Sequence, residues 1–156
     1  MGAEDTSSGS IPVPDTSCLP VFSDNVLPSI LVHLGIIDLS HSTSPLLTRQ
    51  FRQADNLDAL LQSPPSVSHE EMKRWKLQPP KDGPVLTESD AYIIRASAID
   101  ACEQIVEEAH KAVREDCDWL RTLTLTELDG WLWAGAKDRL DYRELARFVL
   151  RDTAYF

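Results

Sequence analysis

The amino-acid sequence predicts an all-α fold, and three observations support that class. Apolar residues recur at helical spacing from about residue 88 to residue 116. A second apolar arc follows a helix-capping signal near residue 124. No stretch alternates between apolar and polar residues with the period of two that is typical of a half-buried strand. We therefore expect helices that pack around one apolar core.

The first part of the chain is expected to contribute few residues to the hydrophobic core. Residues 1–20 are rich in Ser, Pro and Gly, which predicts a flexible lead-in to a domain that spans residues 21–156. Residues 26–34 predict a short helix, and Gly35 is its expected stop.

Residues 40–85 form a poorly defined excursion in the sequence. One or two short helices are predicted within residues 42–63. Prolines bracket residues 64–84, which we interpret as an exposed segment.

The stretch from residue 88 predicts one long amphipathic helix, packed on one side and solvated on the other. Its apolar face is predicted to carry Ile94, Ala98, Ala101, Cys102, Ile105, Ala109, Ala112 and Val113. The polar face is predicted to carry Glu103, Glu107, Lys111 and Arg114.

A second amphipathic helix is predicted to begin at about Leu125, because Thr124 and Glu127 have the spacing of a capping box. Its apolar arc is predicted to hold Leu125, Leu128, Leu132, Trp133 and Ala136. The tail from residue 141 onward predicts a last short helix and an aromatic C-terminus.

Size and charge limit the possible functions. The 156 residues are 42% hydrophobic, which suits one domain with a modest core. The formal net charge is -10 and no basic patch stands out, so direct nucleic-acid binding is not expected. A small phosphorylated ligand needs only a few local donors and is not excluded.

Cysteine usage indicates a cytoplasmic protein. Cys18, Cys102 and Cys117 form no close pair and no metal-ligand spacing, which fits a reducing compartment. No apolar run reaches the length of a membrane span, and no secretion signal is visible at the start. We expect no membrane association and no metal site. His33 and His110 are expected to be hydrogen-bonded on or near helix faces.

Asp129 breaks the apolar arc of the second helix. A carboxylate on a packed face is costly unless it is paired or hydrogen-bonded. Asp129 is expected either to pair with an internal Arg or cap another helix, or to form the end of a pocket for a flat, hydrogen-bonding ring. Trp133 lies one turn later on the same side. The residues alone leave both alternatives open.

Two further charged residues stand at informative positions. Arg95 projects to the edge of the long helix's apolar face, where an ion pair with an internal Asp is favoured over a phosphate contact. Asp24 directly precedes the first predicted helix, which is typical of a cap that accepts a backbone N–H. The helix dipole would favour its ionised form.

Four short segments, "FSDNVLPSILVHLGII", "IIRASAIDACEQI", "LDGWLW" and "VLRDTAYF", follow one another along the chain, and together they resemble motifs of the queuosine salvage proteins, which are queuosine 5′-phosphate N-glycosylases. "FSDNVLPSILVHLGII" resembles the family's F-[ST]-D-Y-x-x-P segment and its following helix, and "IIRASAIDACEQI" resembles its EIRA helix. "LDGWLW" resembles [IL]-D-x-x-L-W, and "VLRDTAYF" resembles the closing H-R-T-R-x-x-Y-[YF]. The motifs follow the family's order and cover residues 21–39 and 86–156.

The chain also departs from the family pattern. Asn25 stands where an aromatic is usual, Ile93 replaces the Glu of EIRA, and the closing motif lacks its His. Family members are considerably longer. The resemblance therefore implies the C-terminal half of a larger helical fold, in which part of the pocket comes from the other half.

The resemblance implies hydrolysis of the N-glycosidic bond of queuosine 5′-phosphate, with release of queuine for salvage into tRNA. It makes Asp24 the catalytic acid residue, which stabilises or attacks the oxocarbenium-like sugar. Asp129 would accept the N1–H and the exocyclic NH₂ of the base, and Trp133 or Phe22 would stack on its ring. No metal or organic cofactor is implied. The alternative is a non-catalytic helical scaffold or binding module.

Overall fold

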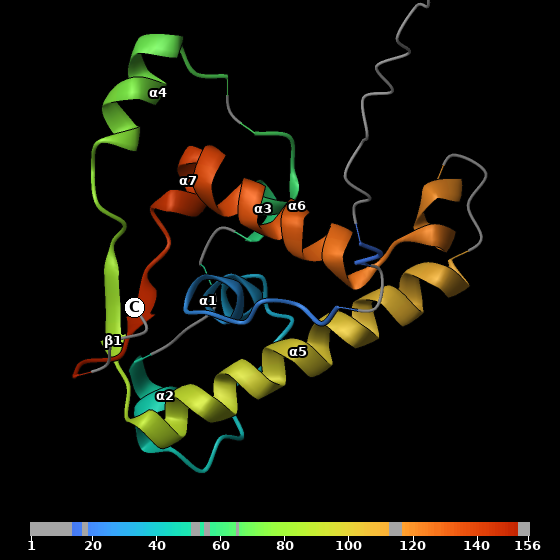
Figure 1. Ribbon diagram of the computed structural model, residues 1–156. Coiled ribbons are helices and arrows are strands. Elements are labelled where there is room, and N and C mark those ends of the chain that lie inside the picture. Colours follow the sequence, from blue (N-terminus) through green and yellow to red (C-terminus); the bar gives the residue numbers. More distant parts are fainter. Residues whose placement is uncertain are drawn as a thin grey trace, which may run out of the picture.

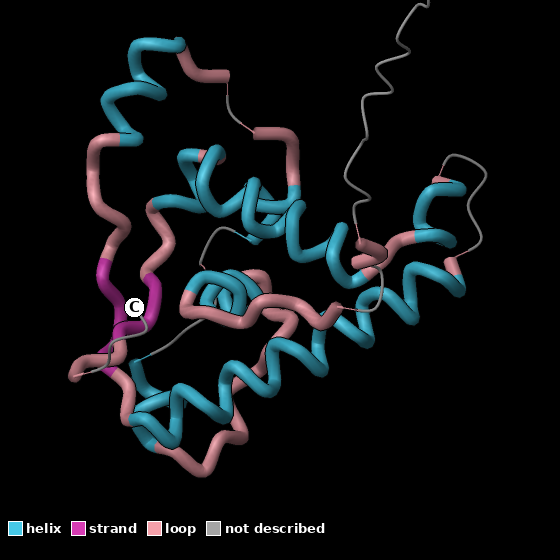
Figure 2. Tube along the Cα trace, viewed as in Figure 1, coloured by secondary structure: helices cyan, strands magenta, loops and turns pink. Residues whose placement is uncertain are grey.

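The fold is mainly helical, with one small sheet. The computed structural model describes residues 14–16, 19–50, 54, 57–64, 66–112 and 117–152. The helices in this part of the chain are α1 (Val26–His33), α2 (Pro45–Gln50), α3 (Leu57–Leu61), α4 (His69–Lys76), α5 (Glu88–Lys111), the 3₁₀ helix η1 (Asp118–Thr122), α6 (Leu125–Asp138) and α7 (Leu140–Arg143). Figure 1 shows their arrangement, and Figure 2 shows the two strands β1 (Asp82–Val85) and β2 (Arg147–Val149) side by side.

Helix α1 forms the centre of the core. All eight of its residues are buried, and it packs against α5, α6 and β2 (Figure 1). Pro28 is tolerated because it lies in the first turn, where the backbone N–H needs no helical partner. Gly35 follows the helix with a φ of 71°, the left-handed conformation that glycine adopts at low cost. The predicted helix and its stop are confirmed.

Helix α5 is the long amphipathic helix that the sequence predicts. Thr87 caps it by accepting a hydrogen bond from the Asp90 N–H at 3.1 Å. Ile94, Ala98 and Cys102 are fully buried on its inner face. The helix ends at Lys111, and the predicted positions Val113 and Arg114 lie outside the described residues.

Helix α6 begins at Leu125, as its capping box predicts. Thr124 accepts the Glu127 N–H at 3.2 Å, and the Glu127 carboxylate accepts the Thr124 N–H at 2.8 Å. Leu128, Leu132 and Ala136 are buried on the face that packs against α1 and α5.

The predicted mainly helical fold is confirmed, and the described residues add a small two-stranded sheet to it. Strands β1 and β2 are parallel, with Asp82 opposite Arg147 and Val85 opposite Val149. A Cβ on Gly83 would lie 2.8 Å from the Arg147 carbonyl oxygen, so only glycine allows this approach without a shift of the backbone. The predicted short helix in the tail is present as α7, but the chain then becomes extended. A strand of three residues is too short to show a period of two.

Strand β2 contributes to the core through Phe148, which is fully buried. The Phe148 N–H donates to Ser29 Oγ at 3.2 Å, and the Asn25 amide donates to the Phe148 carbonyl at 3.2 Å. The extended tail is thereby attached directly to α1.

The segment from residue 40 to residue 85 is more regular than expected. The one or two short helices predicted there are α2 and α3, which bury Leu47 and Leu60. Helix α4, which the sequence reading missed, begins with a capping box of Ser68 and Glu71. None of its residues is buried, so this part is exposed, as predicted, but helical.

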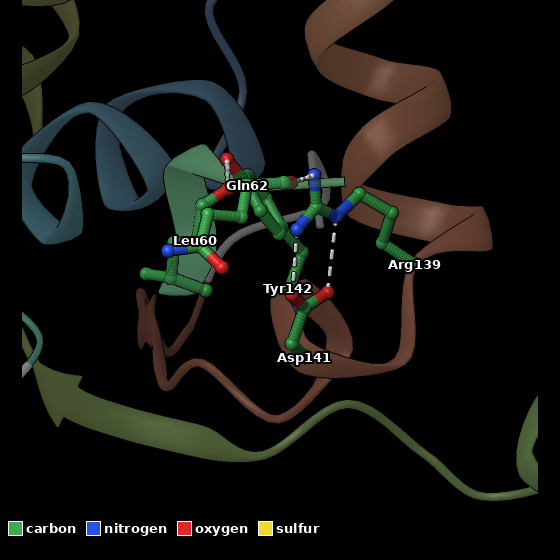
Figure 3. Close-up of polar contacts among 5 residues, drawn as sticks. All are labelled: Leu60, Gln62, Arg139, Asp141 and Tyr142. Carbon is green, nitrogen blue, oxygen red and sulfur yellow. Dashed lines mark hydrogen bonds and ion pairs between the residues drawn. The ribbon is translucent and has the colours of Figure 1, made fainter. Parts of the chain in front are cut away.

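A polar cluster connects α3 to the start of α7 (Figure 3). The Arg139 guanidinium makes two contacts with the Asp141 carboxylate, at 3.1 and 2.7 Å, and donates to the Gln62 carbonyl at 2.9 Å. The buried Tyr142 hydroxyl donates to the Leu60 carbonyl at 3.0 Å. These bonds hold the short helix α3 against the domain.

Most of the predicted lead-in, residues 1–13, 17 and 18, lies outside the described residues. The described part contacts α6, where the Thr126 hydroxyl donates to the Thr16 carbonyl at 2.9 Å. Among the described residues, none of the helices combines the length and the apolar character needed to cross a membrane.

Candidate functional site

The segment that leads into α1 lies between α5 and α6 (Figure 1). The Phe22 N–H donates to Asp129 Oδ2 of α6 at 3.2 Å, and the Ser23 hydroxyl donates to the Arg95 carbonyl of α5 at 3.0 Å. We call Phe22, Ser23, Asp24, Arg95 and Asp129 the junction. It brings together three of the motifs that carry the family resemblance.

Asp24 makes the contacts of a helix cap. Its Oδ1 accepts the Val26 N–H at 2.7 Å and, more weakly, the Leu27 N–H at 3.4 Å. The backbone N-cap position belongs to Asn25, whose side chain makes no capping bond. Asp24 is half-buried and supplies the acceptor that α1 needs. The predicted capping role is confirmed, and the catalytic role stays a prediction.

Asp129 is only half satisfied. Its Oδ2 accepts the Phe22 N–H, whereas its Oδ1 is buried with no hydrogen-bond partner among the described residues. Burial raises the pKa of Asp129, the Phe22 N–H lowers it, and the negative charge of Asp24 raises it further. An unpartnered buried acceptor costs about 1–3 kcal/mol, so Asp129 is maintained at some expense to stability.

Cys102 shows that Asp129 faces α5. The pKa of this thiol is raised to about 11, mainly by burial and secondly by the negative charge of Asp129. Among the described residues, the hydrogen bond to Asp129 comes from neither an Arg side chain nor the first turn of another helix, and an ion pair with an internal Arg stays a prediction. The hydrogen-bond donor is the backbone of the segment before α1.

The two aromatic candidates differ in exposure. The Phe22 side chain is 76% exposed, so it is not a core residue, and its contact with Asp129 is made by the backbone. Trp133 is half-buried and packs against the core. The Lys137 ammonium lies 3.7 Å from the centre of the Trp133 ring. This cation–π contact already occupies one face of the indole.

Arg95 joins the junction through its backbone carbonyl. Its side chain is half-buried on α5, in keeping with the predicted position at the edge of the apolar face. The ion pair and the phosphate contact considered for its guanidinium both stay predictions.

Arg147 is a buried cation that the sequence reading missed. Its guanidinium donates to the Ala136 carbonyl at 2.9 Å, and its Nε has no hydrogen-bond partner in the described part of the chain. Burial and the positive charge of Arg143 lower the pKa of Arg147, whereas the charge of Asp24 raises it. The charge of Asp24 therefore acts on the pKa of both Asp129 and Arg147. An arginine inside the apolar run "ARFVL" was the available signal.

The histidines behave as expected. His33 Nε2 lies 2.8 Å from the Ala146 carbonyl, and His110 Nε2 lies 2.8 Å from the Leu123 carbonyl. Burial lowers the pKa of His33. No group of three or more His, Cys, Asp or Glu residues that could hold a metal ion occurs among the residues that the structure describes.

Three pockets lie away from the junction. A groove of about 420 Å³ separates the second half of α5 from η1 and α6, and a hollow of about 560 Å³ lies beside it along α5. A third pocket, of about 380 Å³, is lined by Trp75, Lys81 and Arg143 among others. None of the three is lined by a junction residue. Chemically, the junction offers two interacting carboxyl groups, one held by a helix N-terminus and one with a buried acceptor.

Comparison of this chain with protein-family models, with curated proteins and with solved structures finds no match in any of the three.

Proposed function

We propose that the chain represents the C-terminal part of a queuosine-salvage hydrolase and that the junction cleaves the N-glycosidic bond of queuosine 5′-phosphate. The observation that carries the proposal is the hydrogen bond from the Phe22 N–H to Asp129. It joins the "FSD" and "LDGWLW" segments, which are the two motifs whose acids the resemblance assigns to the sugar and to the base.

The proposed reaction is a hydrolysis. The bond between C1′ of the ribose and N9 of the base breaks, and its electron pair leaves with the base. Water supplies the hydroxyl at C1′ and the proton that the departing base takes up. The products are queuine and ribose 5-phosphate. In a 7-deazaguanine, position 7 is carbon and cannot be protonated to help the base leave. Stabilisation of the sugar cation must therefore contribute more to lowering the activation barrier.

Asp24 is the proposed acid residue below the sugar. Its Oδ1 is held by the Val26 N–H, which fixes the carboxylate with respect to α1. A carboxylate oriented in this way can stabilise the oxocarbenium-like state or attack C1′. The negative charge of Asp24 raises the pKa of Asp129, and the proposal requires both acids to contact the same ligand.

Asp129 is the residue proposed to accept hydrogen bonds from the edge of the base. Its Oδ1 has no hydrogen-bond partner in the described part of the chain, and its Oδ2 has a second lone pair beyond the one used by Phe22. The adjacent N1–H and NH₂ groups of a guanine-like ring would fill these positions. Because these donors favour the ionised carboxylate, base binding is expected to weaken as the pH falls through the raised pKa of Asp129.

The test is queuine release from queuosine 5′-phosphate by the purified chain and its Asp24→Asn variant. Asn keeps an oxygen acceptor for the α1 amides and removes the charge, so a loss of release of about 10²-fold or more would be chemical in origin. Asp138→Asn, on the exposed face of α6, is the matched control and should keep full activity. Full activity in Asp24→Asn would remove Asp24 from the reaction. No release by the folded parent chain would refute hydrolysis by this chain on its own.

A second candidate function is a non-catalytic helical binding module. The observation that favours it is the groove between α5, η1 and α6, which is lined mainly by apolar side chains and includes the two most exposed tryptophans, Trp119 and Trp131. Such a surface can bind a partner whether or not the junction is catalytic.

A further inference from the structure

We propose that the groove between α5, η1 and α6 docks a basic amphipathic helix of a partner protein. This inference names the partner chemistry of the second candidate function and does not depend on hydrolysis at the junction. It rests on the apolar lining of the groove, on its length and on the sign of the charges along it.

The groove exposes large aromatic side chains. Trp119 of η1 is 62% exposed and Trp131 of α6 is 66% exposed, and both line the same groove. Leu120 and Leu128 line it as well, with Ile105 of α5. A single exposed apolar residue is ordinary, but tryptophans that line one apolar groove are typical of an interface anchor.

Apolar side chains continue along α5 into the neighbouring hollow, whose lining also includes Ser97, Asp100, Gln104 and Glu108. Ile105 also lines the neighbouring hollow, where it is joined by Ile37 and by the 44%-exposed Ile36. Lining residues on α5 run from Ser97 to Ala109. At 1.5 Å of rise per residue this is about 18 Å, the length of roughly three helical turns. We call the groove and the hollow together the α5 channel. Its length matches a short helix that presents apolar anchors at i, i+3, i+4 and i+7.

The charges of the α5 channel determine the sign of the partner. Asp100, Glu108 and Glu127 line it, and no Lys, Arg or His is among its described lining residues. Lys111 forms an exposed ion pair with Glu108 at 2.9 Å and offsets part of that charge, whereas Asp100 and Glu127 keep the lining acidic. A partner with lysines flanking its apolar face is therefore favoured electrostatically.

A second copy of this chain is a poorer occupant. Each copy carries a formal net charge of -10, so association through an acidic channel would bring like charges together. A basic helix gains attraction along the same acids that repel another copy.

The test uses a defined probe: a 14-residue peptide with leucines on one helical face, lysines elsewhere, blocked ends and no tryptophan. Binding to the full chain is measured by calorimetry and by the emission of the protein's tryptophans. We expect saturable 1:1 binding, a shift of the emission to shorter wavelength as Trp119 and Trp131 lose water, and weaker binding at higher salt. The comparison peptides are a shuffled sequence and one with Glu in place of each Lys.

Channel variants connect the binding to this surface. Trp131→Ala removes an exposed anchor without disturbing the core and should weaken binding by about tenfold or more. Ala109→Arg should block the groove, with circular dichroism as the check on folding. Glu108→Gln should weaken binding and reduce its salt dependence. Glu103→Gln, on the exposed face of the same helix, is the matched control and should bind like the parent chain.

Three results would overturn the proposal. The first is equal binding of the shuffled or the Glu-substituted peptide. The second is unchanged affinity in both Trp131→Ala and folded Ala109→Arg. The third is sedimentation of the chain as a dimer that Trp131→Ala dissociates, which would identify a second copy as the occupant. Peptide binding and queuine release are separate readouts, so either function can fail without the other.

Discussion

The backbone N–H of Phe22 donates to Asp129 Oδ2 at 3.2 Å and joins residues that lie 107 positions apart. This bond gives an acid on the packed side of α6 a structural role, because it holds the segment that leads into α1. A substitution at Asp129 therefore affects two properties at once, the position of this segment and any ligand chemistry. The substitution Asp129→Asn separates the two effects, because it keeps an oxygen that can accept the Phe22 N–H and removes the charge.

The capping role of Asp24 can be measured independently of activity. Asp24→Ala removes the acceptor of the Val26 and Leu27 amides and should lower the free energy of unfolding by about 1 kcal/mol. Asp24→Asn should lower the free energy of unfolding by less, because Asn is itself a good capping residue. Urea denaturation of the two variants and the parent chain checks this. Equal losses in both variants would mean that charge, and not the cap, holds α1.

Asp129 should make stability depend on pH. Its pKa in the folded state lies above the ordinary value of 3.8, so the folded state binds the proton more tightly than the unfolded state. The contribution of Asp129 to stability is therefore fully present below pH 3.8 and is lost as the pH rises through the folded pKa. Asp129→Asn removes this dependence and should become relatively more stable than the parent chain as the pH rises. Urea denaturation at a series of pH values measures the difference. A difference in stability that stays constant across the pH series would contradict the shift.

Tyr142 should contribute to stability through its hydroxyl. Tyr142→Phe leaves the Leu60 carbonyl without its donor and should lower the free energy of unfolding by about 1–3 kcal/mol. Tyr92→Phe is the matched control, because that hydroxyl contacts Glu88 on the surface and its loss should change stability little. Thermal or urea denaturation of the pair tests the contrast. Similar losses in both variants would contradict a special role for the α3–α7 contact.

Two glycines should respond to alanine with opposite signs. Gly83→Ala brings a Cβ to within 2.8 Å of the Arg147 carbonyl oxygen and should destabilise the chain by about 1–3 kcal/mol as the strands separate. Gly130→Ala, in α6, meets nothing within 4 Å and should stabilise by about 0.5–1 kcal/mol through helix propensity. Denaturation midpoints of the two variants provide the measurement. A stable Gly83→Ala chain would mean that β1 and β2 need not lie so close.

The helices that the sequence predicts best are those with strong local signals. Thr124 with Glu127 marks the start of α6, and Gly35 marks the end of α1. The same kind of signal, Ser68 with Glu71, begins α4 and was overlooked because the flanking prolines dominated the interpretation. Strand β2 had no comparable local signal. Its extended form depends on pairing with β1, about sixty residues earlier in the chain.

The sequence indicated the two acids of the junction but not the hydrogen bond that connects them to the rest of it. Asp129 stood out because it broke an apolar arc, and Asp24 because it preceded a helix. Their connection runs through the backbone N–H of Phe22, a group that every non-proline residue carries and that no side-chain pattern can reveal. Arg147 had a sequence signal, its position inside an apolar run, but the burial of its side chain follows only from the tail forming strand β2.

The burial of Phe148 has a consequence for synthesis of the protein on the ribosome. This ring completes the packing around α1, yet it is made more than a hundred residues after α1. Until then the entirely buried helix α1 lacks one of its covering elements. The nascent chain must therefore carry an incompletely covered apolar helix for most of its translation, and transiently exposed apolar surface of this kind is prone to aggregation. Folding of this domain is completed only when residue 148 has emerged.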